Sequence, residues 1–467
     1  MRSFPVRQFQ PQRCHAARTM LKRVETSELR LGMYIHKLEG SWFKHPFWKS
    51  KFVLEEMWML EALQGSAVEA VIIDTERGLN NVPERETAHV GASAQASTGS
   101  AAPPQARGMS LAPPRPAANK FAAARVATAK EFGTARKIAD RHAKVVSRVF
   151  IEARLGRGIS ARTVDPLIDD IYASVQRNIY AFNGLLRCRE DSEETYRHAL
   201  ATSALMIALA RQMNLSAAET REAGMAGLLI DIGASQETGG PPHPADIWAG
   251  PASDLETDAH CQHVLAGHAL LKAAGDIPEA VLKVCLRHHE RLDGSGYPHR
   301  LSGSDIDQLS RMAAICDTYD LLVSGSNGSS GGSSGGSSGG SSGGHPGLDP
   351  AEAIRHMGEH CDGLDPAIMV DFIEMVGIYP IGAFVELRSG RLAMVVDEDP
   401  TERALPTVYT FWSRPLERKI KGEVITLSQC YGADEIVGIA QLGGLDLPPL
   451  GALRQTLLTS YTRAAAA

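Results

Sequence analysis

The spacing of apolar residues predicts a long helical domain between about residues 121 and 376. Ile138, Val145 and Val149 follow one another at helical intervals, as the apolar face of an amphipathic helix does. The pattern breaks near Gly156 and then resumes. We therefore expect a mainly α chain in which several helices share one core.

Short apolar runs towards both ends predict β-structure outside this domain. Residues 68–74 are typical of a buried strand and belong to a small α/β module that we place at 24–78. Three strand-like runs separated by Gly, Pro and Asp predict a small β appendage at 377–450. A tail at 451–467 completes the expected order.

Three segments have the composition of flexible chain. Residues 1–23 are basic but lack the apolar core of a secretory signal, so we expect a flexible extension, with Met20 as the natural start. Residues 79–120, rich in Ala, Ser, Pro and Gly, predict a disordered linker. The Gly-Ser run at 326–344 interrupts the helical domain and predicts a flexible coil. It is either an engineered insertion or an expanded natural repeat.

Composition narrows the classes of function. A net charge of -6 provides no general attraction to nucleic acid or to an anionic membrane, so any phosphate binding must be local. No apolar run approaches the roughly 20 residues of a membrane-spanning helix. Seven cysteines without Cys-x-x-Cys spacing indicate neither a disulfide framework nor a zinc ribbon, and we expect a cytoplasmic protein.

Several acids and histidines have the chemistry of metal ligands. His288 and His289 are adjacent, and neutral imidazole is the commonest protein ligand for transition metals. Glu194 and His198 lie four residues apart in a helical stretch, so both project from one face. Asp231 ends an apolar run, where a buried carboxylate is costly unless a cation or hydrogen bonds compensate it.

The stretch from His288 to Pro298, His-His-Glu-x-x-Asp-Gly-x-Gly-Tyr-Pro, resembles the signature of the HD-GYP family. These bacterial metal-dependent phosphodiesterases linearise cyclic di-GMP. The resemblance implies an HD-type helical metal-binding domain with a signature loop that contains Asp293, Gly294, Gly296, Tyr297 and Pro298. The N-terminal module resembles the small domain of unknown function that often precedes HD-GYP domains, through residues 31–35, 42–47 and 68–74.

The same resemblance implies a set of metal ligands: Glu194, His198, Asp231, His263, His288, His289 and Asp317. Asp231 and His263 are also expected to serve catalysis, whereas we expect Asp320 to be a structural neighbour rather than a ligand. Carboxylates mixed with imidazoles suit iron or manganese better than a structural zinc. We expect two or three divalent metals, with one position weakened or lost. Two close metals clamp both oxygens of an in-line displacement and activate the attacking water.

The chain departs from the family at three places. Ile230 stands where the family has the histidine of the HD pair, and isoleucine has no lone pair to donate. Ala234 replaces a lysine that would offset charge on the phosphate, a loss of about 3 kcal/mol or roughly a hundredfold in rate. The basic Arg-Pro-Tyr-Arg-like loop falls on residues 326–329 of the Gly-Ser run. Arg311 remains nearby, either as a structural ion pair or as a phosphate contact.

Two functions follow from this resemblance. The first is metal-dependent hydrolysis of cyclic di-GMP, impaired by the three departures. The second is a catalytically inactive receptor for cyclic di-GMP, or an interaction module whose signature loop contacts a signalling protein. A homodimer and a different nucleotide substrate are further alternatives, because fold and site do not determine the substrate. Nucleic acid and membrane partners are not expected.

Overall fold

The computed structural model describes a set of segments that includes most of the helical and β-structure. They are residues 21–38, 52–54, 57–64, 70–75, 77–79, 126–188, 194–236, 259–324, 347–361, 363–399, 401–430 and 432–465. The chain divides into two compact units, residues 1–111 and 112–467. The linker expected at 79–120, apart from Leu79, and the Gly-Ser run lie outside the described residues.

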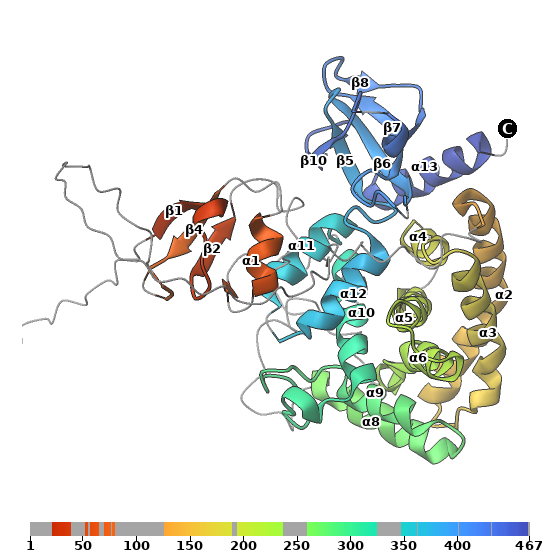
Figure 1. Ribbon diagram of the computed structural model, residues 1–467. Coiled ribbons are helices and arrows are strands. Elements are labelled where there is room, and N and C mark those ends of the chain that lie inside the picture. The colour runs from red at the N-terminus through yellow and green to blue at the C-terminus, as the bar shows by residue number, and fades with distance from the viewer. Residues whose placement is uncertain are drawn as a thin grey trace, which may run out of the picture. The chain divides into compact units, whose positions relative to one another are not determined.

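The first unit is an antiparallel sheet with one described α-helix. Its elements are β1 (Leu21–Glu25), the 3-10 helix η1 (Thr26–Glu28), β2 (Tyr34–Leu38), β3 (Phe52–Val53), α1 (Met57–Gln64) and β4 (Ala70–Asp74). The strand order is β1-β4-β2-β3, which places β4 inside the sheet (Figure 1). Ile35, Leu63 and Ile73 bring β2, α1 and β4 into one core.

The first strand begins earlier than we expected. Leu21 and Lys22, which we assigned to the flexible extension, pair with Asp74 and Ile73 across the sheet. Val24 alone among the residues of β1 is buried, so the strand has no alternating apolar pattern that would reveal it. Backbone pairing with β4 determines its conformation.

The second unit consists mainly of helices, and this confirms the predicted fold class. The helical elements are α2 (Thr128–Arg154), α3 (Ala161–Arg177), α4 (Ala181–Arg187), α5 (Glu194–Gln212), α6 (Ala217–Leu229), η4 (Ile232–Gln236), α8 (Ala259–Ala274), α9 (Glu279–Arg287), η5 (Gly303–Asp305), α10 (Gln308–Ser324), α11 (Pro350–His360) and α12 (Pro366–Val376). Helix α5 packs against α6 and α10, and its residues from Ala199 to Ala210 are all buried. A helix that is apolar on all sides belongs in the core.

A second sheet and a final helix complete this unit. The strands are β5 (Phe384–Leu387), β6 (Arg391–Asp397), β7 (Thr407–Ser413), β8 (Arg418–Lys419), β9 (Val424–Thr426) and β10 (Ile436–Ile439), with the 3-10 helix η6 (Leu427–Gln429). Their order is β10-β5-β6-β7-β8, and β9 also pairs with β7 (Figure 1).

Helix α13 (Leu450–Ala464) occupies the segment that we expected as a tail. Leu453, Leu457 and Tyr461 are buried, and Arg454 Nε donates to the carbonyl oxygen of Gly382 at 2.9 Å. An amphipathic spacing of four residues therefore docks this helix against the β-structure.

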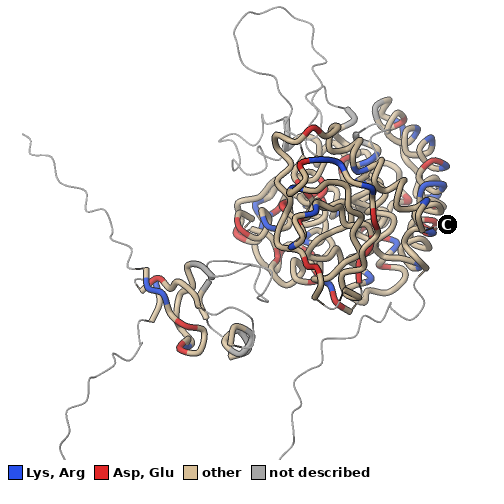
Figure 2. The backbone as a smooth tube through the Cα atoms, turned by 90° about the horizontal axis from the view of Figure 1, so that it is seen from above, with Lys and Arg blue, Asp and Glu red and all other residues tan. Residues whose placement is uncertain are grey.

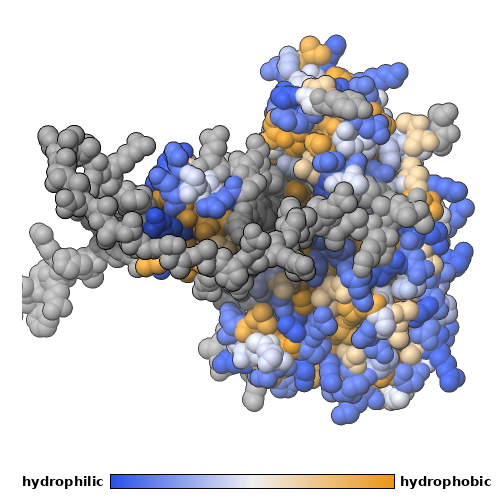
Figure 3. Space-filling view, in the orientation of Figure 1, coloured by the Kyte–Doolittle hydropathy of each residue, from blue (hydrophilic) through white to orange (hydrophobic). Residues whose placement is uncertain are grey.

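The surface of the second unit carries charges of both signs. Figure 2 shows basic and acidic residues interspersed along its chain. In the view of Figure 3 its surface is largely hydrophilic, with hydrophobic residues scattered among polar ones. None of the helices within the described residues combines the length and the apolar character needed to cross a membrane.

Candidate metal centre

Five helical elements of the second unit carry the predicted ligands. His198 lies on α5, Asp231 is the second residue after α6, His263 lies on α8, His288 and His289 follow α9, and Asp317 lies on α10. All six are buried. Glu194 is the first residue of α5, and its side chain lies outside the described part of the structure.

One group of ligands combines three imidazoles with one carboxylate. The Nε2 atom of His263 lies 3.4 Å from Nε2 of His288 and 3.2 Å from Nε2 of His289. Asp231 Oδ1 lies 3.5 Å from Nε2 of both His263 and His288. We call Asp231, His263, His288 and His289 the three-histidine group; one ligand atom from each lies within 4.8 Å of the others.

The second group lies next to the other oxygen of the Asp231 carboxylate. His198 Nε2 lies 3.4 Å from Asp231 Oδ2 and 3.2 Å from Asp317 Oδ1. We call His198, Asp231 and Asp317 the His198 group; these three residues could also hold one ion. Asp231 thus directs one oxygen to each group, as a carboxylate shared by two metal ions would.

The hydrogen bonding of these residues fits a divalent cation. Nε2 of His198, Oδ1 of Asp231 and Oδ1 of Asp317 are buried without a hydrogen-bond partner among the described residues. A buried polar atom left without a partner costs about 1–3 kcal/mol. A cation between them would satisfy lone pairs that otherwise face one another.

Burial and neighbouring charges shift the pKa values of His198, Asp231 and His289 in different directions. Burial opposes charge on His198, but the neighbouring aspartates outweigh it and hold its pKa well above the usual value. Burial also disfavours the Asp231 carboxylate, yet His198 and His288 hold its pKa well below the usual value. Burial and the adjacent imidazoles of His288 and His263 lower the pKa of His289 well below the usual range. Asp231 is therefore ionised at neutral pH, and His289 is neutral with a lone pair to donate. The raised pKa of His198 keeps a proton on its ring in the absence of metal, and a cation bound by Nε2 would displace that proton.

Asp320 lies behind the His198 group. Its Oδ2 is 2.8 Å from His198 Nδ1, and both side chains are buried. We had expected Asp320 to be a structural neighbour rather than a ligand, and its contact is with a ligand rather than with the centre itself. A carboxylate on Nδ1 selects the tautomer that presents Nε2 and makes the imidazole a better donor.

Removing this contact should weaken metal binding. We expect Asp320→Ala to lower metal affinity about 10–100-fold, while Asp320→Asn, which keeps an acceptor for Nδ1–H, loses less. Competition with a calibrated chelator measures both affinities. Equal affinity in the parent and Asp320→Ala would show that Asp320 does not support His198.

The signature loop folds back onto His289. The ring of Tyr297 stacks on the imidazole of His289, with centroids 4.7 Å apart and planes at 26°. Gly296 permits this approach, because a Cβ there would lie 2.4 Å from the carbonyl oxygen of His289. Gly294 has φ +77, Asp293 Oδ1 accepts from the backbone N–H of Ser295, and the Tyr297–Pro298 peptide is cis.

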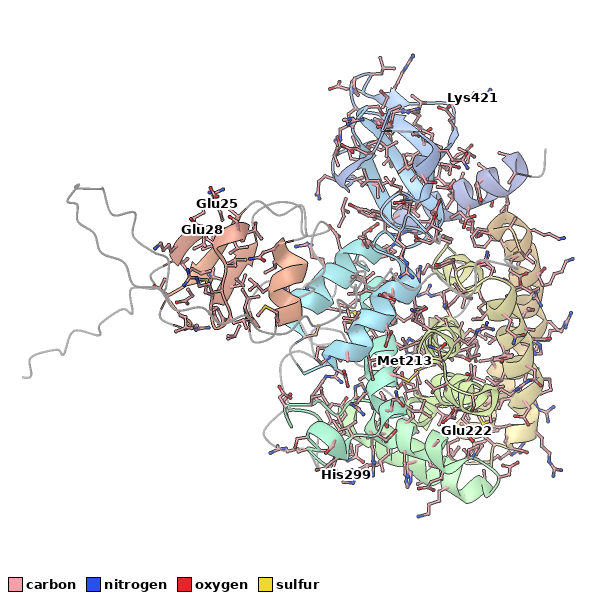
Figure 4. The ribbon with its side chains drawn as sticks, viewed as in Figure 1. Glu25, Glu28, Met213, Glu222, His299 and Lys421 are labelled. Carbon is pink, nitrogen blue, oxygen red and sulfur yellow. The ribbon has the colours of Figure 1, made fainter. Side chains whose placement is uncertain are left out.

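Glu290 and Arg291 are buried inside this motif, and we had assigned them no role. The carboxylate of Glu290 accepts from the backbone N–H groups of His299 at 2.7 Å and Leu301 at 2.9 Å. His299, labelled in Figure 4, has 51% of its side chain exposed, so Glu290 joins the centre to the outer end of the loop. Their position inside the motif could have drawn attention to both residues in the sequence. Their burial depends on the tertiary fold and could not be predicted from that position.

Two of the three departures from the family pattern, Ile230 and Ala234, lie within the described residues. Ile230 is buried directly before Asp231, whereas Ala234 is partly exposed in η4. Residues 326–329 lie outside the described part. Arg311 Nη1 donates to Asp365 Oδ2 at 2.7 Å, and Asp365 caps the N-terminus of α12. Of our two alternatives for Arg311, these contacts favour the structural ion pair.

Comparisons with known proteins cover both units. Family models match residues 21–164 as a domain of unknown function (DUF3391) and residues 185–333 as an HD domain. The cyclic di-GMP phosphodiesterase PA4108 of Pseudomonas aeruginosa is 37% identical over 420 residues, which are 90% of this chain and 92% of that protein. The cyclic di-GMP phosphodiesterase response regulator RpfG of Xanthomonas campestris is 33% identical over 25% of this chain and 30% of its own length.

Among solved structures, the chain is similar to Bd1817, an HDG"Y"P protein from Bdellovibrio bacteriovorus. The TM-score is 0.39 at 13% identity, over 76% of this chain and 98% of that one.

Proposed function

Because this chain belongs to the HD-GYP family of metal-dependent phosphodiesterases, we propose that it hydrolyses cyclic di-GMP at the centre around Asp231. The observation that carries the proposal is the position of this carboxylate. Its two oxygens face two separate groups of buried imidazole and carboxylate ligands. A single structural metal would need only one such group.

Iron or manganese fits these donors best, since imidazole and carboxylate together suit both ions and the described ligands include no thiolate. The three-histidine group would hold one ion and the His198 group the other. Bound there, the two ions would clamp the reacting oxygens of the phosphodiester and activate the attacking water.

The chain's own residues prepare the centre. Tyr297 holds the ring of His289, and Asp320 holds that of His198, so both imidazoles present Nε2 to the interior. Burial of all six described ligands keeps bulk water from competing for the same positions and strengthens every charge interaction there.

We further propose that turnover is slow. The His198 group has three described members, and the buried Ile230 beside it has no lone pair to add a fourth. Ala234 adds no cation near the phosphate. The centre therefore keeps the donors for binding metal but has fewer groups that offset charge in the transition state.

The same substitutions favour a second candidate, a receptor that binds cyclic di-GMP without cleaving it. In that case the exposed end of the signature loop, at Asp293, Ser295 and His299, would contact a protein partner or a second copy of the chain. Binding of cyclic di-GMP without formation of the linear product would distinguish this candidate from the first.

Metal depletion and refilling tests the proposed function. The purified chain is stripped with a chelator, refilled with Mn²⁺ or Fe²⁺, and assayed for linear product from cyclic di-GMP. We expect no turnover when stripped and slow turnover when refilled. Tight binding of cyclic di-GMP without product in every metal state would favour the receptor, and equal turnover with and without metal would contradict both the mechanism and the assignment of the ligands.

A further inference from the structure

Arg291 is a buried cation inside the signature loop. Only 9% of the residue is exposed. Its Nη1 donates to the carbonyl oxygens of His288 at 3.3 Å and Glu290 at 3.1 Å. The aliphatic part of its side chain packs against Gly363, where a Cβ atom would lie 2.9 Å from the Arg291 Cβ. The guanidinium is thus fixed next to the two adjacent histidines.

Among the described residues, no carboxylate contacts Arg291 and neutralises its charge. Arg311 and Arg287 pair with Asp365 and Asp307, at 2.7 and 3.4 Å. Arg291 forms no such ion pair with any described residue, and its hydrogen-bond acceptors there are neutral carbonyl oxygens. Burying an unpaired cation costs several kcal/mol, so such a group persists where negative charge elsewhere compensates it.

The field of Arg291 reaches the metal centre. Its charge interacts with the carboxylate of Asp317 in the His198 group and with the phenol of Tyr297. It also acts on His289 in the three-histidine group. A fixed positive charge therefore acts on members of both ligand groups.

We propose that the guanidinium of Arg291 binds the phosphodiester of the substrate beside the metal centre and offsets the charge that develops on it. This inference rests on the proposed function. Described residues use only Nη1, which leaves Nε and Nη2 as a second edge, and guanidinium groups bind phosphate through two parallel hydrogen bonds. Arg291 thereby supplies the cation that Ala234 cannot.

Three variants of the Mn²⁺-loaded full chain test the role of the charge. Arg291→Met removes it and keeps an unbranched stem against Gly363, Arg291→Lys keeps it, and Arg300→Met removes an exposed charge from the same loop. We expect Arg291→Met to lose about a hundredfold in kcat/KM and to weaken binding of cyclic di-GMP. Metal content should stay at the parent's value. Arg291→Lys should lose less, and Arg300→Met should match the parent.

Charge rescue separates substrate binding from a purely structural role. Adding Ala234→Lys to Arg291→Met should raise kcat/KM by at least tenfold more than the same substitution does in the parent, because the new cation then replaces the missing one at the phosphate. If Arg291 only maintained the loop, Ala234→Lys would raise kcat/KM by the same factor in Arg291→Met as in the parent. Loss of metal or of the fold in both Arg291→Met and Arg291→Lys, or an equal gain from Ala234→Lys in both backgrounds, would overturn the proposal.

Failure of this inference differs from failure of the proposed function. If the parent binds or hydrolyses cyclic di-GMP and Arg291→Met equals Arg300→Met in both assays, the function stands and the role of Arg291 is wrong. If the parent neither binds nor hydrolyses cyclic di-GMP at any metal load, the proposed function fails, and the role of Arg291 fails with it.

Discussion

Asp231→Asn is expected to abolish hydrolysis of cyclic di-GMP and to deplete metal from both ligand groups. One anionic oxygen becomes an NH₂ group that cannot donate a lone pair, and in either amide orientation it faces the His198 group or the three-histidine group. Breaking a buried charge interaction of this kind costs about 3–5 kcal/mol. Lost from the metal-bound state, that energy corresponds to metal affinity lower by roughly a hundred- to several thousandfold.

Metal analysis and turnover on the same sample measure this effect. Asp305→Asn is a suitable control because Asp305 lies exposed in η5, and it should match the parent in both assays. Full metal content together with parental turnover in Asp231→Asn would remove Asp231 from the centre.

Restoring the two missing side chains is the second large effect that we predict. Ile230→His should raise the metal content or affinity of the His198 group, and Ala234→Lys should raise kcat with metal content unchanged. Together they should increase turnover about a hundredfold or more, since one well-placed cation alone offsets about 3 kcal/mol of barrier. Measuring each single variant beside the double variant separates the two contributions.

Thermal stability gives this second prediction an independent readout. A histidine at the buried position 230 is costly unless its imidazole finds a partner. Ile230→His should therefore melt at a lower temperature than the parent without metal and recover when Mn²⁺ is added. A parent that already holds its full metal complement and turns over as fast as the double variant would refute the proposed impairment.

The helical part of the fold was predictable because apolar residues recur at helical spacing along its sequence, as they do from Ile138 to Val149. Two elements were not. Strand β1 has a single buried residue, Val24, so backbone pairing rather than apolar alternation determines it. Helix α13 has the right apolar spacing, but we assigned its residues to a tail and overlooked Leu453 and Leu457.

For the candidate site, the motif predicted which residues to examine but not how they are arranged. That Asp231 faces two groups depends on how α5, α6, α8, α9 and α10 pack together, which sequence spacing does not encode. The roles of Glu290 and Arg291, and the contact of Asp320 with His198, could not be predicted for a related reason. Each is a common surface residue type whose importance follows from burial and from one specific contact or charge interaction.

Anomalous X-ray diffraction from crystals of the chain saturated with Mn²⁺ most directly tests whether Asp231 joins two metal positions in one centre. We predict two peaks in contact with Asp231. One should also contact the imidazoles of the three-histidine group, and the other should contact His198 and Asp317. A single peak at saturating metal, or peaks that do not contact Asp231, would contradict the account.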